Sequence, residues 1–272
     1  SFGGIYLATG ARSNVITWNR VQSNSTGVYL SGVTNNVVTN NPWIRQNSLY
    51  GVQLTGNSVS NRIVGNMVNS NGGIGSAGIY LNGNGVDMNR VVSNTVFTRA
   101  TGDYGISISG CDRNIVTNNA VMHAATGGIQ LTRGARSNLI IWNRIQSNVV
   151  GVYVNGVTNN AVTNNPWIRQ NSQYGVQVFG NSVSNRIVAN TLFSNGGIGG
   201  AAIYLNGNNV DMNRVASNSI RGRLTTDYGI HIALGDGNVV TNNAIVAAAA
   251  TAAVYFVNTA STNRVVGNRV CS

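Results

Sequence analysis

The chain has 272 residues, of which 8% are charged, and its formal net charge is +11 because arginines outnumber aspartates and neither lysine nor glutamate occurs. No stretch approaches the roughly 18 apolar residues of a transmembrane helix, and two cysteines are too few for a disulfide framework. The positive charge favours an acidic partner, while a composition rich in Val, Ile, Thr, Tyr, Asn and Gly favours strands and tight turns over helices.

The chain opens on a short strand pattern that recurs along its whole length. Gly or Ala is followed by an apolar residue, any residue and a second apolar residue, as in residues 4–7, 27–30, 78–81 and 151–154. Alternation with a period of two indicates a strand that buries one face. The middle residue of each strand is therefore predicted to point outward.

Each strand pattern is followed by an asparagine motif: Asn, any residue, Val or Ile, two residues, Asn, any residue and a large apolar residue. Its eleven leading residues are Asn14, Asn36, Asn61, Asn89, Asn114, Asn138, Asn160, Asn185, Asn213, Asn238 and Asn263. Its closing residues, predicted to face the interior, are Val21, Trp43, Val68, Val96, Val121, Ile145, Trp167, Leu192, Ile220, Ile245 and Val270. A period of 22 to 28 residues is typical of one turn of a solenoid.

Stacked coils would bring these asparagines into register. A buried amide needs hydrogen-bond partners, and the carbonyl of the next Asn in the column provides one. We therefore interpret the asparagines as internal ladders that stabilise the turns, and assign them no binding role.

With these motifs, the chain resembles the right-handed parallel β-helix superfamily, especially the repeats shared by NosD-like periplasmic proteins, polysaccharide lyases, epimerases and glycoside hydrolases. The resemblance is carried by the Gly-Ile-Tyr-Leu strands and by residues 61–68 (Asn-Arg-Ile-Val-Gly-Asn-Met-Val) with their copies. It implies an all-β solenoid of about 11 coils. Such residues specify a fold and leave the activity open.

The coils themselves repeat in groups of five. Residues 40–66 and 164–190 differ at only four of 27 positions. The whole chain, 1–272, is predicted as one β-helix domain, with a first super-repeat at 11–134, a second at 135–258 and a final coil at 259–272. Any surface site is then expected to occur twice, about 24 Å apart along the axis, which suits a fibre or a multivalent binder.

The outward residues of the first strand in each coil form a column of candidate glycan-binding side chains, because Tyr can stack on sugars and Gln can bond hydroxyls. The alternative is a Tyr ladder that only stiffens the sheet. The column contains Ser107 and His231, and the predicted binding residues are Tyr6, Tyr29, Gln53, Tyr80, Gln130, Tyr153, Gln177, Tyr204 and Tyr255.

Arginine forms a second outward feature, because Arg62 and Arg90 follow the leading Asn in adjacent coils, as do Arg186 and Arg214. Neighbouring like charges repel unless an anion lies between them. The four arginines therefore indicate either a polyanion site or a solvated basic face. No aromatic residues interleave with them, which argues against single-stranded nucleic acid.

Acid–base chemistry has few candidates. His231 is predicted to lie near Asp227 and Asp236 in one coil, with Asp211 stacked beside Asp236 as Asp87 is beside Asp112. A carboxylate pair can form a glycosidase dyad or a Ca²⁺ site, although Asp is also a common turn residue. No cluster of metal ligands and no lyase or epimerase signature occurs, so we predict no metal site and no cofactor beyond a weakly supported Ca²⁺.

The sequence favours a secreted, extracellular or cell-surface module, structural or glycan-facing, with an acidic polysaccharide as partner. Neither end resembles a cap, which favours end-to-end self-association into a filament or a place in an adhesin. The alternatives are a polysaccharide lyase, epimerase or hydrolase acting on an acidic glycan and, with less support, a phage tail-fibre segment. No secretory signal opens the chain, so we expect any export signal to have been removed or to lie upstream.

Overall fold

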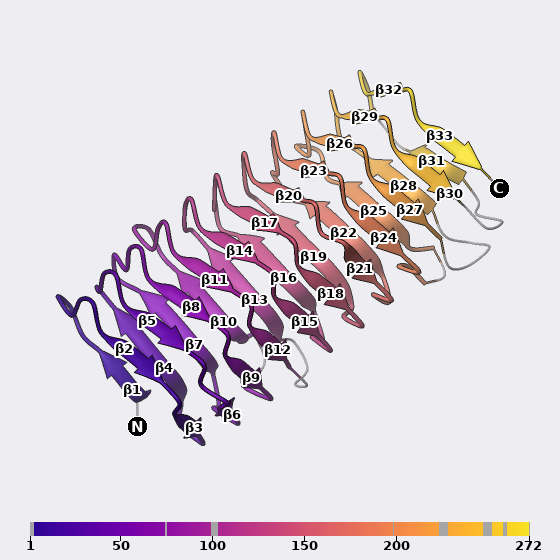
Figure 1. The fold of residues 1–272 in the computed structure, drawn as a ribbon. Coiled ribbons are helices and arrows are strands. Elements are labelled where there is room, and N and C mark those ends of the chain that lie inside the picture. Colours follow the sequence, from indigo (N-terminus) through magenta and orange to yellow (C-terminus); the bar gives the residue numbers. More distant parts are fainter. Residues whose placement is uncertain are drawn as a thin grey trace.

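The computed structural model describes residues 3–73, 75–98, 103–197, 199–222, 228–246, 252–257 and 260–271. In these residues the chain is all-β, with three parallel sheets of eleven strands stacked into a right-handed β-helix (Figure 1). The predicted fold class is confirmed. Within the same ranges, no helical segment is long and apolar enough to cross a membrane.

The first sheet is built from the predicted Gly-apolar-any-apolar pattern. Its strands are β1 (Gly3–Leu7), β4 (Thr26–Ser31), β7 (Tyr50–Thr55), β10 (Ala77–Asn82), β13 (Tyr104–Ser109), β16 (Gly127–Thr132), β19 (Val150–Asn155), β22 (Tyr174–Phe179), β25 (Ala201–Asn206), β28 (Tyr228–Ala233) and β31 (Ala252–Val257). In β4, Val28 and Leu30 are fully buried while Tyr29 between them is partly exposed. The alternation therefore places one face of the sheet in the core, as predicted.

Each asparagine motif forms two strands, one on each side of its second Asn. The second sheet comprises β2 (Val15–Thr17), β5 (Val37–Thr39), β8 (Arg62–Val64), β11 (Arg90–Val92), β14 (Ile115–Thr117), β17 (Leu139–Ile141), β20 (Ala161–Thr163), β23 (Arg186–Val188), β26 (Arg214–Ala216), β29 (Val239–Thr241) and β32 (Arg264–Val266). The third sheet comprises β3 (Arg20–Gln22), β6 (Trp43–Arg45), β9 (Met67–Asn69), β12 (Thr95–Phe97), β15 (Ala120–Met122), β18 (Arg144–Gln146), β21 (Trp167–Arg169), β24 (Thr191–Phe193), β27 (Ser219–Arg221), β30 (Ala244–Val246) and β33 (Arg269–Cys271).

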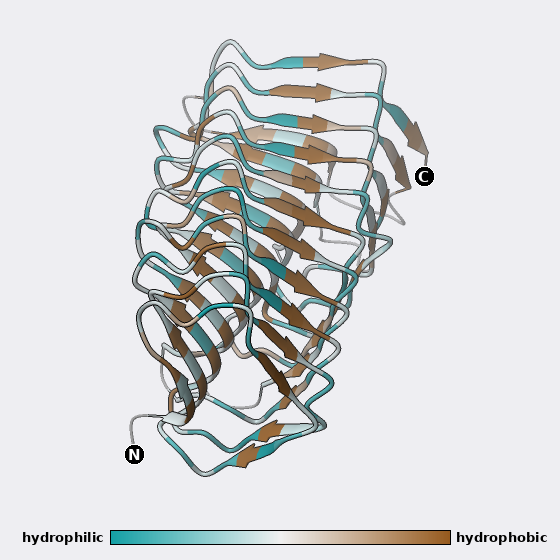
Figure 2. Cartoon of the chain, turned by 60° about the vertical axis from the view of Figure 1, so that its left-hand side comes forward, coloured by the Kyte–Doolittle hydropathy of each residue, from teal (hydrophilic) through white to brown (hydrophobic). Residues whose placement is uncertain are grey.

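The corners between the sheets are formed by a residue with positive φ directly before an asparagine. In the first coil these residues are Ser13 (φ 57°), Trp18 (φ 58°) and Ser23 (φ 58°). The left-handed conformation turns the chain sharply and is found mostly in Gly, Asn and Asp. Repeating it in coil after coil produces a narrow prism whose hydrophobic residues recur at the same place in successive strands (Figure 2).

The asparagines form the predicted ladders. The Asn61 side-chain amide donates to Asn89 Oδ1 at 3.1 Å, and the Asn89 amide donates to Asn114 Oδ1 at 3.1 Å. The second Asn of each motif repeats the arrangement, as in Asn66 to Asn94 at 3.0 Å. A third, interrupted ladder that the motif did not predict follows the third sheet, with Asn24, Asn47 and Asn71 in the first super-repeat and Asn148, Asn171 and Asn195 in the second.

Three of the predicted interior residues are not buried, and one of them, Val270 in the last strand of its sheet, is 55% exposed although it pairs with Ile245 in the predicted register. Trp43 and Trp167 point outward and are 36% and 42% exposed, whereas Ile44 and Ile168 are fully buried in their place. Val21 pairs with Ile44, so the register has shifted by one residue. The extra residue in each of these two coils is the proline itself, Pro42 or Pro166, which lengthens the turn after the second Asn.

Candidate functional site

The three sheets differ sharply in the polar residues that they carry. The strands of the first sheet contain all ten tyrosines of the chain and no charged residue. The strands of the other two sheets contain no acidic residue but eleven arginines: Arg20, Arg45, Arg62, Arg90, Arg144, Arg169, Arg186, Arg214, Arg221, Arg264 and Arg269. The predicted tyrosine column and the predicted arginine pairs therefore lie on different sheets and belong to separate surfaces.

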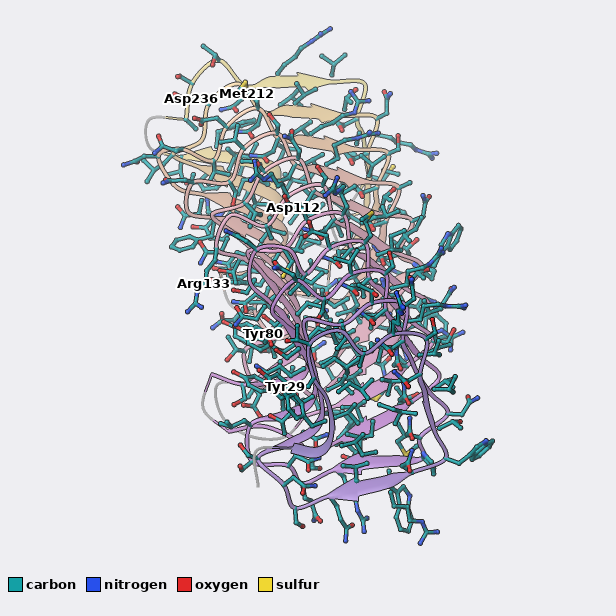
Figure 3. The ribbon with its side chains drawn as sticks, turned by 90° about the vertical axis from the view of Figure 1, so that its left-hand side faces the viewer. Tyr29, Tyr80, Asp112, Arg133, Met212 and Asp236 are labelled. Carbon is teal, nitrogen blue, oxygen red and sulfur yellow. The ribbon has the colours of Figure 1, made fainter. Side chains whose placement is uncertain are left out.

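The tyrosine column has the predicted register. Tyr6, Tyr29, Gln53, Tyr80, Ser107, Gln130, Tyr153, Gln177, Tyr204, His231 and Tyr255 pair in succession across the eleven strands. Along one side of the molecule, Tyr29, Tyr80 and Arg133 follow one another (Figure 3). Tyr6 and Tyr29 stack with ring centroids 5.1 Å apart. Ring-to-ring packing of this kind stiffens the face whether or not it also binds a ligand.

A second set of tyrosines was missed by sequence reasoning. Tyr50, Tyr104, Tyr174 and Tyr228 precede the Gly of their strands, one position before the repeat pattern begins. Tyr50 stacks on Tyr80 at 4.7 Å, and Tyr174 stacks on Tyr204 at 4.8 Å. The sequence signal was the recurring Tyr-Gly pair at the start of these strands, each two or three coils after the last.

Between the two sets of tyrosines lies a polar recess in the first super-repeat. It has a volume of about 190 Å³ and is lined by Tyr50, Gly75, Ser76, Ala77, Tyr80, Tyr104, Ser107, Ser109, Gln130, Thr132 and Arg133. Ser107 Oγ donates to Gln130 Oε1 at 2.9 Å. The hydroxyl of Ser109 is buried and has no hydrogen-bond partner among the described residues. Such a group lacks the partner that buried polar atoms ordinarily have.

Burial affects the protonation of two tyrosines that line the recess, Tyr104 and Tyr50. It raises the pKa of Tyr104, and the neighbouring Tyr153 raises it further, while the contact with Gln130 opposes the change. Burial also raises the pKa of Tyr50, with Tyr80 acting in the same direction and Arg133 against it. Both phenols therefore keep their protons at neutral pH, so they can donate hydrogen bonds but are poor bases.

The equivalent position in the second super-repeat is filled with aromatic side chains. His231 replaces Ser107 and Tyr255 replaces Gln130. The His231 ring lies 4.7 Å from that of Tyr204, 4.9 Å from that of Tyr228 and 5.0 Å from that of Tyr255. The second copy therefore keeps a recess beside Tyr174, Gly199 and Gly200, the counterparts of Tyr50, Gly75 and Ser76, but larger side chains fill its other end.

The predicted catalytic residues have separate partners. His231 Nε2 is buried without a hydrogen-bond partner in the described part of the chain, and burial lowers the pKa of its imidazole. Asp211 Oδ1 instead accepts the backbone N–H of Asp236 at 2.9 Å, and Asp236 Oδ1 accepts the N–H and hydroxyl of Ser261. Asp227 lies outside the described residues. The stacked aspartates are thus present as predicted, and their contacts are those of turns.

The other aspartate pair behaves in the same way. Asp87 Oδ1 accepts the N–H of Asp112, and ion pairs join Asp87 to Arg113 at 3.2 Å and Asp112 to Arg136 at 3.1 Å. These carboxylates cap backbone N–H groups and balance nearby arginines. Their oxygen atoms are already engaged, which leaves little room for a Ca²⁺ shell of six to eight oxygen ligands.

The sequence and fold resemble several known proteins. Residues 3–177 match the family described as periplasmic copper-binding protein (NosD). No curated protein matches the chain. Among solved structures, PfbA, a surface adhesin of Streptococcus pneumoniae, gives a TM-score of 0.63 at 14% identity over 94% of this chain and 73% of its own.

Two further structures belong to other functional classes. The A-module of mannuronan C-5 epimerase AlgE6 of Azotobacter vinelandii gives a TM-score of 0.60 at 15% identity, over 96% of this chain and 65% of its own. The Dettilon tailspike protein gives 0.59 at 15% identity, over 98% of this chain and 61% of its own. Identities this low show the shared fold alone. The chain spans about three fifths of the length of the first solved structures that it matches.

The described residues do not fit the copper in the family description. They contain no group of three or more His, Cys, Asp or Glu side chains that could hold a metal ion. The buried Cys111 thiol donates to the backbone oxygens of Ser109 and Gly83, and burial raises its pKa to about 12. A copper ligand would have to be the thiolate, and His231 is enclosed by tyrosine rings. No step is therefore assigned to copper.

Proposed function

The chain belongs to the NosD family, and from that premise and the geometry of its first sheet we propose that it is an extracytoplasmic β-helix module that binds an acidic glycan without cleaving it. The location follows the periplasmic description of the family and the surface adhesin among the structural neighbours. The choice of a glycan as ligand rests on the uncharged tyrosine face and on the recess in that face.

The observation that carries the proposal is the recess beside Ser107. At about 190 Å³ it is smaller than the 300–1,000 Å³ pockets of drug-sized ligands, so it suits a single sugar ring. The phenols of Tyr50, Tyr80 and Tyr104 offer faces on which sugar C–H groups pack. Gln130 and Ser109 offer polar atoms to hydroxyls, and Arg133 offers a guanidinium to a carboxylate.

The column on either side of the recess extends the proposed track. Tyr29 and Gln53 precede it, and Tyr153 and Gln177 follow it, all in register on neighbouring strands. A polymer lying across the strands would meet one of these side chains about every 4.8 Å. Weak stacking at several positions would then add to the affinity that the recess provides.

Binding without cleavage follows from the side chains around the recess. Its lining contains no His, Asp, Glu or Lys, and the raised pKa of Tyr50 and Tyr104 makes these two phenols poor bases. Where the structure describes them, His231, Asp211 and Asp236 have no contact that would place an acid and a base across one bond. Filament assembly, adhesin or tail-fibre membership and the super-repeat boundaries stay predictions from the sequence.

The test measures binding of short uronic-acid oligosaccharides to the full chain by isothermal titration calorimetry. We expect S107A/Q130A to weaken binding about tenfold or more, through the loss of hydrogen bonds worth roughly 1 kcal/mol each. R133Q should reduce the preference for the acidic oligosaccharide over its uncharged counterpart.

The matched control is H231A, which changes the equivalent position of the second super-repeat and should leave affinity unchanged. Wild-type affinity in S107A/Q130A, or an equal loss in H231A, would place the ligand elsewhere. Release of shortened or unsaturated products from a uronate polymer would show that the module is an enzyme.

A further inference from the structure

All four tryptophans lie on the third sheet or at the corner that leads into it. Trp43 and Trp167 are in β6 and β21, and Trp18 and Trp142 occupy the turns between β2 and β3 and between β17 and β18. The members of each pair are 124 residues apart, so both super-repeats carry the same arrangement. Trp18 is 73% exposed and Trp142 is 53% exposed. Two large apolar side chains therefore project into solvent at one edge.

The backbone at this corner disfavours a bulky side chain. Trp18 and Trp142 have φ of 58° and 59°, in the left-handed region. The other coils place smaller residues at the same corner, with positive φ throughout: Asn40, Gly65, Ser93, Asn118, Asn164, Ala189, Ser217, Asn242 and Gly267. Neither indole gains burial in return. Strain at exposed, duplicated side chains is typical of a functional surface.

In the first super-repeat, two arginines are held against the ring of Trp43. The guanidinium carbons of Arg20 and Arg45 lie 4.0 Å and 4.5 Å from the centroid of the Trp43 ring. Arg45 Nε also donates to Gln22 Oε1 at 3.1 Å. Cation–π contact and this hydrogen bond hold the guanidiniums in place while their terminal N–H groups have no carboxylate partner among the described residues.

The second super-repeat reproduces this cluster. Arg144 and Arg169 lie 4.4 Å and 4.6 Å from the Trp167 centroid, and Arg169 Nε donates to Gln146 Oε1 at 2.9 Å. Two positively charged groups at one ring repel each other unless an anion joins them. Each cluster is thus a preorganised site for a phosphate-like oxyanion, to which arginine can donate two parallel hydrogen bonds.

Arginines also flank the corner on its other side. Arg62 pairs with Arg90, and Arg186 pairs with Arg214, on exposed positions of the second sheet. Exposed apolar side chains accompany the arginines on the third sheet, with Met67 at 47% and Phe193 at 40%. Indoles at the apex, arginines on both flanks and no acid in the strands match the chemistry of an anionic membrane interface.

A soluble polyanion fits the same charges less well. Base stacking needs an open aromatic face, whereas guanidiniums already contact the Trp43 and Trp167 rings. A glycan would gain little from Met67 and Phe193. We propose that the edge between the second and third sheets docks on an anionic phospholipid surface, with Trp18 and Trp142 in the headgroup layer and the two Arg–Trp–Arg clusters on lipid phosphates.

Each Arg–Trp–Arg cluster forms one anchor together with the exposed tryptophan of its super-repeat, Trp18 or Trp142. The two anchors define how the molecule lies on the membrane. Five coils separate them, which is about 24 Å along the axis, so simultaneous contact lays the rod flat. The second contact then becomes intramolecular and strengthens attachment beyond that of either anchor. The first sheet is a different face of the prism and keeps its recess for the glycan.

The test uses the full chain with vesicles of phosphatidylcholine alone and of phosphatidylcholine and phosphatidylglycerol in equal parts. Because every tryptophan lies on this surface, a blue shift of intrinsic fluorescence and co-sedimentation both report docking. We expect binding only to the anionic vesicles, with the affinity falling as salt rises. W18N/W142N should reduce it about tenfold or more, and R20T/R144T should reduce it similarly.

The substitutions keep the fold because this chain already uses Asn at that corner, as at Asn40, and Thr at the equivalent third-sheet position, as at Thr95. Y6S, which removes an exposed aromatic residue from the first sheet, is the matched control and should bind like the wild type. Absence of binding to anionic vesicles, or equal binding by W18N/W142N, overturns the proposal. A different outcome would assign the edge to a soluble polyanion instead. In that case polyphosphate displaces the chain from vesicles, and W18N/W142N binds polyphosphate in the absence of vesicles as weakly as it binds the vesicles themselves.

Discussion

At the scale of single residues, one position decides where the tyrosine face is open. Ser107 and His231 occupy equivalent places in the same column, but the serine leaves a recess and the histidine fills it. The ring of His231 is surrounded by three tyrosines, and its Nε2 has no partner among the described residues. The histidine that the sequence marked as a candidate base is therefore packed against three aromatic rings, and its catalytic role stays a prediction.

This environment predicts a pH effect on stability. Burial lowers the pKa of His231 from 6.5, so the unfolded chain binds more protons than the folded chain below about pH 6.5. The buried, neutral imidazole therefore makes its full contribution to stability above the unfolded pKa of about 6.5. This contribution is lost as the pH falls from there through the lower pKa of the folded state. Thermal unfolding followed by circular dichroism should show a larger loss between about pH 7.5 and pH 5 in the wild type than in H231S. Equal losses in the two proteins would contradict this environment.

At the scale of the elements, the asparagine ladders hold the corners of successive coils together. Asn89 shows the full pattern: its Oδ1 accepts from the N–H and the amide of Asn61, and its amide donates to Ser58 O and Asn114 Oδ1. The side chain is fully buried. Each ladder residue thus satisfies backbone groups in neighbouring coils that no water reaches.

Removing one such residue should be costly. N89A leaves several buried donors and acceptors unpaired, so we expect it to lower the free energy of unfolding by about 2–5 kcal/mol in urea denaturation. N84A, at an exposed loop asparagine of the same coil, should change it by less than about 0.5 kcal/mol. A similar small effect for both would show that the ladders contribute little.

The elements also show what sequence can and cannot predict. The Asn and Val/Ile spacing predicted the ladders and the core because each depends on residue type at a fixed interval. Pro42 and Pro166 each shifted the register by one residue, which turned Trp43 and Trp167 outward against the pattern. The recess escaped prediction because it depends on the sizes of Tyr80, Ser107 and Gln130 together, on three strands far apart in the sequence.

At the scale of the whole molecule, a duplicated scaffold carries both duplicated and single features. The two Arg–Trp–Arg clusters repeat with matching contacts, whereas the Ser107 and Gln130 end of the polar recess has an aromatic counterpart, His231 and Tyr255, in the second super-repeat. The family and the fold neighbours are consistent with several activities. The distribution of side chains over the three faces is what supports the proposed glycan surface on the first sheet and the proposed anionic-lipid surface at the edge between the other two.

The stoichiometry of binding tests this account most directly. Titration of the full chain with an acidic oligosaccharide short enough to span only the recess should give one bound molecule per chain, despite the internal duplication, and S107A/Q130A should weaken binding at that site about tenfold or more. Two equivalent molecules per chain, or one molecule whose affinity S107A/Q130A leaves unchanged, would contradict it.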